Sequence, residues 1–301
     1  MRETTPPPVD RPPQMRPCGP LPRLATLAHG EGWRVIDYTC HAGPNDTPFE
    51  ERHEEVSIAA VIAGSFHYRA TAGEALLYPG AFLLGNAGDC FQCSHKHGTG
   101  DRSIAFLFAP ALFQEIAAAT AGTSRFRFPT AMLPATRGLT VPGVALAHAA
   151  RVEGAAGLGE AAIRLAETVL EALCGAAKSP ASASPRDLRR VSNVLRHIEA
   201  HAEAPLNLDA LAGVAAMSKY HFLRTFRRIA GVTPYEFLLG VRMRRAALAL
   251  ATTPAPVTTI ALDAGFGDLS TFHGRFREVF GTTPAAYRAR VQGPRVAESA
   301  G

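Results

Sequence analysis

The chain has 301 residues, of which 47% are hydrophobic and 19% charged, and a formal net charge of +5, values typical of a globular protein with two domains. No stretch of about 18 apolar residues occurs, and the first residues lack the basic and apolar segments of a secretory signal, so we expect neither a membrane span nor export. Five cysteines are too few for a disulfide scaffold, and their odd number fits a reducing compartment, so we expect a cytoplasmic location.

The charge is unevenly distributed along the chain. Residues 186–301 contain 16 Lys and Arg against 9 Asp and Glu, a net charge of +7, whereas residues 1–185 carry a net charge of −2. A basic half beside a slightly acidic half suggests that the basic half binds a polyanion and that the other half has a different task.

The first third of the chain divides into an arm and a strand-rich unit. Residues 1–22 include eight prolines, a composition that cannot bury a core, and we interpret them as a disordered, solvated arm. After it, short apolar runs alternate with turn residues, which indicates an all-β unit. The predicted strands are residues 34–40, 56–63, 65–70, 74–78, 82–84, 91–94 and 103–108. Strands of this number and spacing predict a small barrel or jelly roll.

Helices are predicted after the strands, at residues 109–120 and within residues 142–178. The second of these segments has a wide apolar stripe formed by Ala162, Leu165, Ala166, Val169, Leu170 and Leu173. This stripe has two interpretations: it packs on the barrel, or it pairs with its copy in a homodimer. Residues 179–185 read as a linker, residues 186–292 as a helical domain and residues 293–301 as a flexible tail.

Residues 208–291 contain two copies of one pattern. Four residue pairs are separated by 50 positions: Phe222 and Phe272, Phe226 and Phe276, Gly231 and Gly281, Pro234 and Pro284. Each copy predicts a short apolar helix, a tight turn and a second helix, which is capped by Ser218 in the first copy and by Asp268 in the second. The two phenylalanines of each second helix lie four residues apart and are expected to bury one of its faces.

The opposite face of each second helix is then exposed, with arginine and small polar side chains suited to a DNA major groove. The candidate DNA-binding residues are Ser218, Lys219, Tyr220, Leu223, Arg224, Arg227 and Arg228 in the first copy, and Leu269, Ser270, His273, Gly274, Arg275 and Arg277 in the second. An all-α interaction domain that binds no DNA is the alternative.

Between the copies, Thr233 and Glu236 form a predicted capping box, with Pro234 at the first helical position. The helix that follows is expected to run for about 18 residues, a length on the order of 27 Å. Successive major grooves on one face of DNA are about 34 Å apart. A helix of this length can therefore set the distance between the two candidate reading helices.

The repeat closely resembles the signature of the AraC/XylS family of transcription regulators. The resemblance is carried by Gly265-Phe266-Gly267-Asp268-Leu269-Ser270-Thr271-Phe272, Phe276-Arg277, Phe280-Gly281-Thr282-Thr283-Pro284 and Tyr287-Arg288, and upstream by Leu211-Ala212, Met217-Ser218, Phe222, Arg224-Thr225-Phe226, Gly231, Thr233-Pro234, Arg242-Met243 and Ala246. It implies a DNA-binding domain with two reading helices, a role in transcription, and double-stranded DNA and RNA polymerase as partners. It also implies that Tyr220, Leu223 and Arg224 face bases in one groove, and that Leu269, Ser270, His273 and Gly274 face the next.

One position departs from the family pattern. Many relatives have arginine two residues after the first phenylalanine of the second reading helix, as Arg224 stands to Phe222, but this chain has Gly274 there. Arginine comes one residue later, at Arg275, about 100° further round the helix. We therefore expect the second copy to read bases more weakly than the first.

The strand-rich unit resembles the cupin-type sensor barrel that is common in the same family, on the basis of residues 53–64, Gly73, Pro79-Gly80 and Asn86. The resemblance implies a small-molecule effector. Metal-dependent cupins place a histidine shortly after the Pro-Gly turn, where this chain has Phe82, Leu83 and Leu84. We therefore expect a sensor rather than an enzyme, with no cofactor assigned; a cupin metalloenzyme fused to a DNA-binding module and a ligand-independent architectural protein are the alternatives.

A cysteine and histidine cluster leaves further possibilities open. Cys90, Cys93, His95 and His97 have the ligand types of a zinc site, with Cys40, His41 and His53 available from earlier strands. The two thiols of Cys90 and Cys93 could also form a redox pair. Cys90 and Cys93 are an odd number of residues apart, so a regular strand would direct them to opposite faces. A structural role, or a place in a pocket for an organic ligand, is the third interpretation. In total, the sequence predicts an α+β protein in which a cupin-like β-barrel (jelly roll) with accessory helices, residues 23–178, precedes an all-α domain with two helix-turn-helix motifs joined by a linking helix, residues 186–292.

Overall fold

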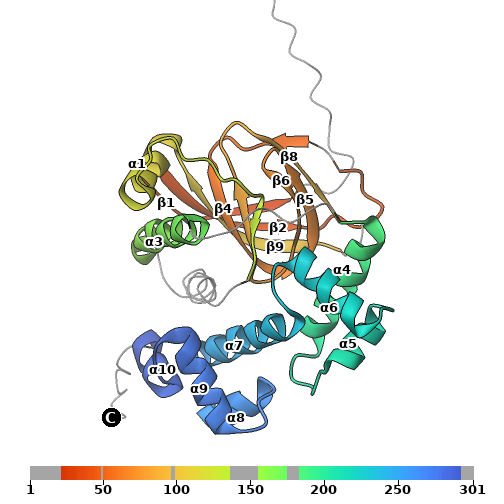
Figure 1. Ribbon diagram of the computed structural model, residues 1–301. Coiled ribbons are helices and arrows are strands. Elements are labelled where there is room, and N and C mark those ends of the chain that lie inside the picture. Colours follow the sequence, from red (N-terminus) through yellow and green to blue (C-terminus); the bar gives the residue numbers. More distant parts are fainter. Residues whose placement is uncertain (1–21, 49, 96–98, 136–154, 175–182, 293–301) are drawn as a thin grey trace, which may run out of the picture.

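The computed structural model describes residues 22–48, 50–95, 99–135, 155–174 and 183–292. Almost all of the predicted arm, most of the predicted linker and the whole predicted tail lie outside these residues. Strands with two accompanying helices form one part of the molecule, and a set of helices forms the other part (Figure 1). We call these parts the β domain and the helical domain.

The β domain consists of two antiparallel sheets rather than one closed barrel. The first has the order β1-β2-β9-β4-β7-β10, and the second the order β3-β8-β5-β6. The strands are β1 Arg23–Gly30, β2 Trp33–Cys40, β3 Glu50–Arg52, β4 Val56–Gly64, β5 Phe66–Ala70, β6 Gly73–Leu77, β7 Phe82–Gly85, β8 Cys90–Ser94, β9 Asp101–Phe108 and β10 Met132–Leu133. All seven predicted strands are present within one or two residues of their predicted ends.

Two helices cover the first sheet: α1, Pro110–Ala121, and α3, Ala155–Cys174. The apolar stripe of α3 is buried and shares one core with α1 and the first sheet. It therefore packs on the β domain of its own chain, which is the first of the two interpretations, and it does not offer the free surface that pairing in a homodimer requires. Residues 142–154 of the predicted helical segment lie outside the described residues.

The helical domain begins with α4, Pro185–Ala200, whose N-cap Ser184 accepts a hydrogen bond from the backbone N–H of Asp187. The remaining helices are α5 Leu208–Val214, α6 Lys219–Ala230, α7 Pro234–Thr252, α8 Val257–Asp263, α9 Leu269–Phe280 and α10 Pro284–Gln292. The predicted capping box is present, since Thr233 and Glu236 bond each other's backbone N–H groups. No helix in the described part of the chain is both long and apolar enough to cross a bilayer.

The two domains share a core. Residues Phe66, Leu77 and Tyr78 of the β domain belong to the same buried cluster as Val194 of α4 and Phe226 of α6. A hydrogen bond accompanies this apolar contact: the buried hydroxyl of Tyr78 donates to the backbone carbonyl of Ala230 at the end of α6. The ring of Tyr78 also packs edge-on against Phe237 of α7, with centroids 5.3 Å apart.

Two further contacts fix this interface. Gly231, at φ +76°, lies so close to Pro134 that an added Cβ would be 2.7 Å from the proline Cβ. The guanidinium of Arg244 on α7 contacts Gly80 of the β domain and is paired with Glu199 of α4 at 2.9 Å. The interface thus joins the β domain to the end of α6, to α4 and to the first half of α7.

Candidate nucleic-acid interface

The first candidate reading helix is α6, the second helix of a unit formed with α5. Phe222 and Phe226 are fully buried, and their rings contact each other with centroids 5.6 Å apart. The face opposite the phenylalanines is exposed and carries Leu223, Arg224 and Arg227. Neither arginine forms an ion pair within the described residues, so both guanidinium groups are available to a partner.

The second candidate reading helix is α9, which pairs with α8 in the same way. Phe272 and Phe276 are fully buried. Ser270, His273 and Gly274 are exposed on the other side. The predicted orientation of both repeats, with phenylalanines inward and polar residues outward, is therefore confirmed.

The two helix starts differ from each other. Asp268 caps α9, because its Oδ1 accepts a hydrogen bond from the N–H of Thr271 at 2.7 Å. Ser218 occupies the N-cap position of α6, but its side chain makes no capping hydrogen bond. The sequence therefore predicted the N-cap position correctly, but the predicted capping by the Ser218 side chain was wrong. The side chain of Ser218 is exposed.

Some of the basic residues predicted to contact DNA form ion pairs within the chain. Lys219 pairs with Asp209 at 2.8 Å, Arg228 with Asp187 at 3.3 Å, and Arg275 with Glu278 at 2.9 Å. Arg277 is exposed. Leu269 is partly buried, and Tyr220 lies in α6 with its side chain outside the described part of the structure.

Helix α7 connects the two units and packs on both. Phe237, Leu238 and Val241 in its first half belong to the core shared with α6 and the β domain. Its second half contributes Met243 and Leu250 to a separate core formed with α8, α9 and α10. The helix has 19 residues, a length on the order of 28 Å, which agrees with its predicted role as a spacer.

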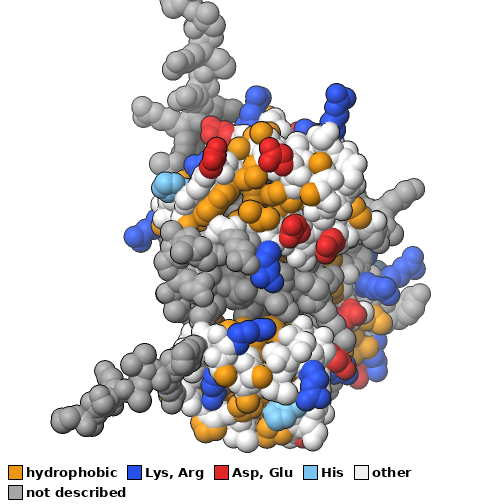
Figure 2. Space-filling view, turned by 90° about the vertical axis from the view of Figure 1, so that its left-hand side faces the viewer, with side chains coloured by type: hydrophobic (Ala, Val, Ile, Leu, Met, Phe, Trp, Pro, Cys, Tyr) orange, Lys and Arg blue, Asp and Glu red, His pale blue; other side chains and the backbone are white. Residues whose placement is uncertain are grey.

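The surface charge follows the division into domains. On the side of the molecule shown in Figure 2, acidic and hydrophobic side chains gather on the β domain, whereas Lys and Arg side chains are spread over the helical domain below it. Polyanions are attracted to the basic part by long-range electrostatics before any specific contact forms.

The β domain contains an open cavity of about 450 Å³ between its two sheets. Ile36, Ala59 and Leu83 line it from the first sheet, and Phe66 and Phe91 line it from the second. This volume and this largely apolar lining are typical of a site for a small organic ligand.

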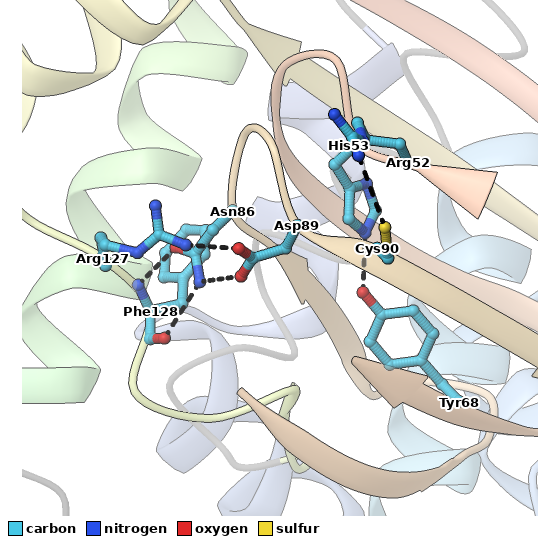
Figure 3. A network of polar contacts seen from close by, with 8 residues as sticks. All are labelled: Arg52, His53, Tyr68, Asn86, Asp89, Cys90, Arg127 and Phe128. Atoms are coloured by element: carbon cyan, nitrogen blue, oxygen red, sulfur yellow. Dashed lines mark hydrogen bonds and ion pairs between the residues drawn. The ribbon is translucent and has the colours of Figure 1, made fainter. Parts of the chain in front are cut away.

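Tyr38 and His53 are among the polar residues that line this cavity. The Nε2 atom of His53 lies 2.7 Å from the hydroxyl of Tyr68 (Figure 3). The ring of His53 stacks on Phe91, with centroids 4.1 Å apart. Burial lowers the pKa of His53 to about 4, although the charge of Asp89 opposes the shift. Burial, followed by the nearby acidic groups, raises the pKa of Tyr38 and Tyr68. At neutral pH these groups are therefore uncharged hydrogen-bonding partners.

The predicted metal ligands do not all come together. Cys90 lies beside Arg52, with its Sγ 4.0 Å from the guanidinium (Figure 3), whereas Cys93 lines the cavity. His97 lies outside the described residues. His95 is instead grouped with Cys40 and Asp101. The separation of Cys90 and Cys93 agrees with their odd spacing on a strand.

His95 and Asp101 form a buried pair. The Nε2 atom of His95 lies 2.7 Å from Oδ1 of Asp101, and the two side chains are 3% and 4% exposed. Burial lowers the pKa of His95, but hydrogen bonds to Asp101 and Cys40 and their charges outweigh burial and raise that pKa to about 9. Burial and the neighbouring acidic groups raise the pKa of the Cys93 thiol.

Two helix-turn-helix units that share a basic domain define a DNA-binding protein of the transcription-regulator class. The family model described as "Helix-turn-helix domain" matches residues 211–290. The regulatory protein SoxS of Salmonella typhimurium is 35% identical over 101 residues, which cover 34% of this chain and 94% of SoxS. The right origin-binding protein of Escherichia coli is 35% identical over 98 residues, which cover 33% of this chain and 34% of that protein.

Among solved structures, the DNA-binding domain of AdpA in complex with a target DNA is 31% identical, with a TM-score of 0.34; the match covers 35% of this chain and 96% of that one. The match to SoxS spans nearly the whole of a regulatory protein. The chain belongs to the AraC family of transcription regulators. Two of the relatives that it matches, SoxS and Rob of Salmonella typhimurium, are regulators by name.

Proposed function

We propose that this protein is a sequence-specific transcription regulator whose affinity for DNA or ability to activate transcription is controlled by a small molecule bound in the β domain. In this proposal α6 and α9 enter successive major grooves on one face of the duplex, with α7 as the spacer. RNA polymerase is the further partner expected of such a regulator. The observation that carries the proposal is the pair of exposed polar helix faces, each opposite two buried phenylalanines.

Within this proposal the first unit reads bases and the second contributes more to phosphate binding. Arg224 and Leu223 are on the exposed face of α6, where an unpaired arginine can bond the guanine edge. On α9 the corresponding position is Gly274, which has no side chain to bond a base. Arg275 is held by Glu278, so Arg277 is the better candidate for a phosphate contact from α9.

Five further candidates fall into two groups. Ser218, Ser270 and His273 are exposed near the start or on the outer face of their helices and are proposed to contact DNA directly. Lys219 and Arg228 are proposed to contact phosphates after exchanging an internal carboxylate for the phosphate. Such exchange costs little, because exposed ion pairs are worth only about 0–1 kcal/mol.

The cavity gives a physical route from effector to DNA. Phe66 and Leu83 line the cavity and also belong to the core that contains Phe226 of α6 and Phe237 of α7. A molecule that displaces either cavity side chain therefore acts on the packing that fixes the first unit. Since packed cores are not continuously deformable, a small shift at the cavity can change the position of α6.

Selection of binding sites from random duplexes, followed by footprinting, tests the DNA-reading part of the proposal. We expect two protected segments about one helical turn apart, and a specific affinity on the order of a thousandfold or more above that for scrambled DNA. A single protected segment, or equal affinity for all duplexes, would contradict the proposal.

A second experiment tests control by an effector. Small aromatic and aliphatic acids and phenols are screened by thermal shift, and those that stabilise the protein are added to the DNA-binding assay. The matched variant is Ala105→Leu, which narrows the cavity from β9 of the first sheet. We expect a ligand that stabilises the unsubstituted protein to change its affinity for DNA, and we expect Ala105→Leu to abolish this change. Ligands that bind the unsubstituted protein without changing DNA affinity or transcription would overturn the effector-controlled mechanism.

A further inference from the structure

Cys40, His95 and Asp101 converge at one edge of the cavity, and their potential ligand atoms all lie within 4.8 Å of one another. The three residues come from different parts of the chain. Cys40 ends β2, Asp101 begins β9, and His95 directly follows β8 of the other sheet. This group shares His95 with the set of Cys90, Cys93, His95 and His97 that the sequence suggested, and it contains Cys40 and Asp101 in place of the other three.

We propose that Cys40, His95 and Asp101 form a binding site for one transition-metal ion of the zinc class. A thiolate, an imidazole and a carboxylate are all established ligands of zinc, with bonds of about 2.0–2.3 Å. Ligand atoms at the corners of such a tetrahedron are roughly 3.3–3.8 Å apart. Small side-chain rotations therefore suffice to bring the three atoms to bonding distance.

The backbone holds two of the ligands in place. Cys40 and Asp101 are direct cross-strand partners in the β2–β9 ladder, so their side chains leave the sheet next to each other. Two glycines with positive φ allow this close approach. An added Cβ at Gly64 would lie 2.7 Å from Cα of Asp101, and one at Gly100 would lie 2.8 Å from the carbonyl oxygen of Cys40.

The site has an open side. All three proposed ligands line the 450 Å³ cavity, together with Cys93. Cys40, Cys93 and His95 also line a second, smaller hollow of about 40 Å³. A metal bound by three protein ligands keeps a fourth position, which water or a small molecule in the cavity can fill.

The ligand set matches a divalent ion in charge. A Cys40 thiolate and an Asp101 carboxylate together neutralise a dication, and His95 binds it as neutral imidazole. A bound site that is neutral as a whole avoids the cost of an unpaired buried charge.

Titration of chelator-treated full-length protein with Co²⁺ alone, and then competition with Zn²⁺, tests the site. We expect one ion per chain and a thiolate-to-cobalt charge-transfer absorption that Zn²⁺ abolishes. Cys40→Ser should remove this absorption, and Cys40→Ser and Asp101→Asn should each weaken binding at least about tenfold. Cys90→Ser and Cys174→Ser are matched controls, because neither thiol belongs to the group, and both should retain the absorption and the affinity.

Two outcomes would overturn the site: no saturable binding, or an absorption lost in Cys90→Ser and kept in Cys40→Ser. Folding is checked by thermal unfolding without metal. Asp101→Asn also disturbs the pair with His95, so Cys40→Ser, which leaves that pair intact, decides the result if Asp101→Asn unfolds. The absorption does not depend on DNA, so this proposal can fail while the regulatory function stands, and the reverse also holds.

Discussion

The two helix-turn-helix units have the same internal architecture but different surroundings. The first unit is built into the β domain: the end of α6 accepts a hydrogen bond from Tyr78, and Phe226 belongs to a core shared with the sheets. The second unit has its own core, in which Phe272 and Phe276 pack with Met243 of α7 and residues of α10. The described β-domain residues contribute nothing to that second core.

This difference divides the work between the units. A change in the cavity of the β domain reaches the first unit through direct packing, but it reaches the second unit only through α7. The first unit also carries Arg224 at the base-reading position, whereas the second carries Gly274 there. Control by the β domain therefore acts first on the unit that we expect to contribute more sequence selectivity.

The largest expected effect comes from removing a core phenylalanine. Phe272→Ala should cost about 3–5 kcal/mol of unfolding free energy, the usual range for a buried phenylalanine. Because the second core is separate, hydrogen exchange should show loss of protection in α8 to α10 while α4 and α6 stay protected.

Phe222→Ala is the matched change in the first unit, since Phe222 is also fully buried and occupies the equivalent position. In Phe222→Ala the loss of protection from hydrogen exchange should extend to β6 and β7 through the shared core. If both variants unfold the whole chain together, the two cores are not independent, and the comparison of the units fails.

Next in size is the effect of the two exposed arginines on DNA binding. Arg224→Ala should cost about 1–3 kcal/mol on the selected site, roughly a 5- to 150-fold loss, and much less on a scrambled duplex. Arg277→Ala should weaken binding to both duplexes similarly and lower the salt dependence of log K by about 1 unit of slope. Salt-titrated fluorescence anisotropy measures both; equal losses on both duplexes for Arg224→Ala would remove it from the base-reading set.

The sequence was informative wherever a local pattern decided the structure. Strands such as β4 and β9 were predicted from apolar runs between turns, and the repeat was predicted from the spacing of its phenylalanines. Three strands were missed for local reasons. Strand β1 is mostly exposed, β3 consists of Glu50, Glu51 and Arg52, and β10 has two residues, so none has an apolar run to detect.

The arrangement of residues distant in the chain was not predictable in the same way. The hydrogen bond from Tyr78 to Ala230 joins residues 152 positions apart, and no periodicity in either segment indicates it. The position of Asp101 was not predictable either, because in the sequence it simply follows Gly98-Thr99-Gly100. Its place beside Cys40 depends on strand register, which a single sequence does not fix.

A smaller effect is expected from the hydrogen bond that links the domains. Tyr78→Phe keeps the ring that packs on Phe237 and removes only the hydroxyl that donates to Ala230. A hydrogen bond of this kind contributes about 0.5–1.5 kcal/mol. We expect a modest loss of stability and a weaker response of DNA affinity to any cavity ligand. Tyr235→Phe is a suitable control, because Tyr235 is 61% exposed; an unchanged ligand response in Tyr78→Phe would mean that the coupling uses the apolar contacts alone.

The second unit should gain stability from a helix-favouring change. Gly274 lies in the interior of α9, and an added Cβ there would meet no heavy atom within 4 Å. Gly274→Ala should therefore raise the unfolding free energy by about 1 kcal/mol, the difference in helix propensity between the two residues. Denaturant unfolding measures the gain. Loss of DNA affinity in this stabilised variant would indicate that the glycine allows a close approach to DNA.

The smallest expected effect concerns the turn of the first unit. Ala216 has φ +49°, a left-handed conformation, whereas the equivalent turn residue in the second unit is Gly265 at φ +91°. A left-handed backbone conformation costs a residue with a Cβ roughly 1–2 kcal/mol. Glycine avoids this cost but loses more conformational entropy on folding, so only part of the free energy is gained. Ala216→Gly should therefore stabilise the chain by about 0.5–1 kcal/mol and make the turn of the first unit like that of the second. Denaturant unfolding measures the change, and no gain of stability in Ala216→Gly would contradict strain at this turn. The neighbouring Ala215 is right-handed, at φ −76°, and its methyl group is buried, so Ala215→Gly should destabilise the chain.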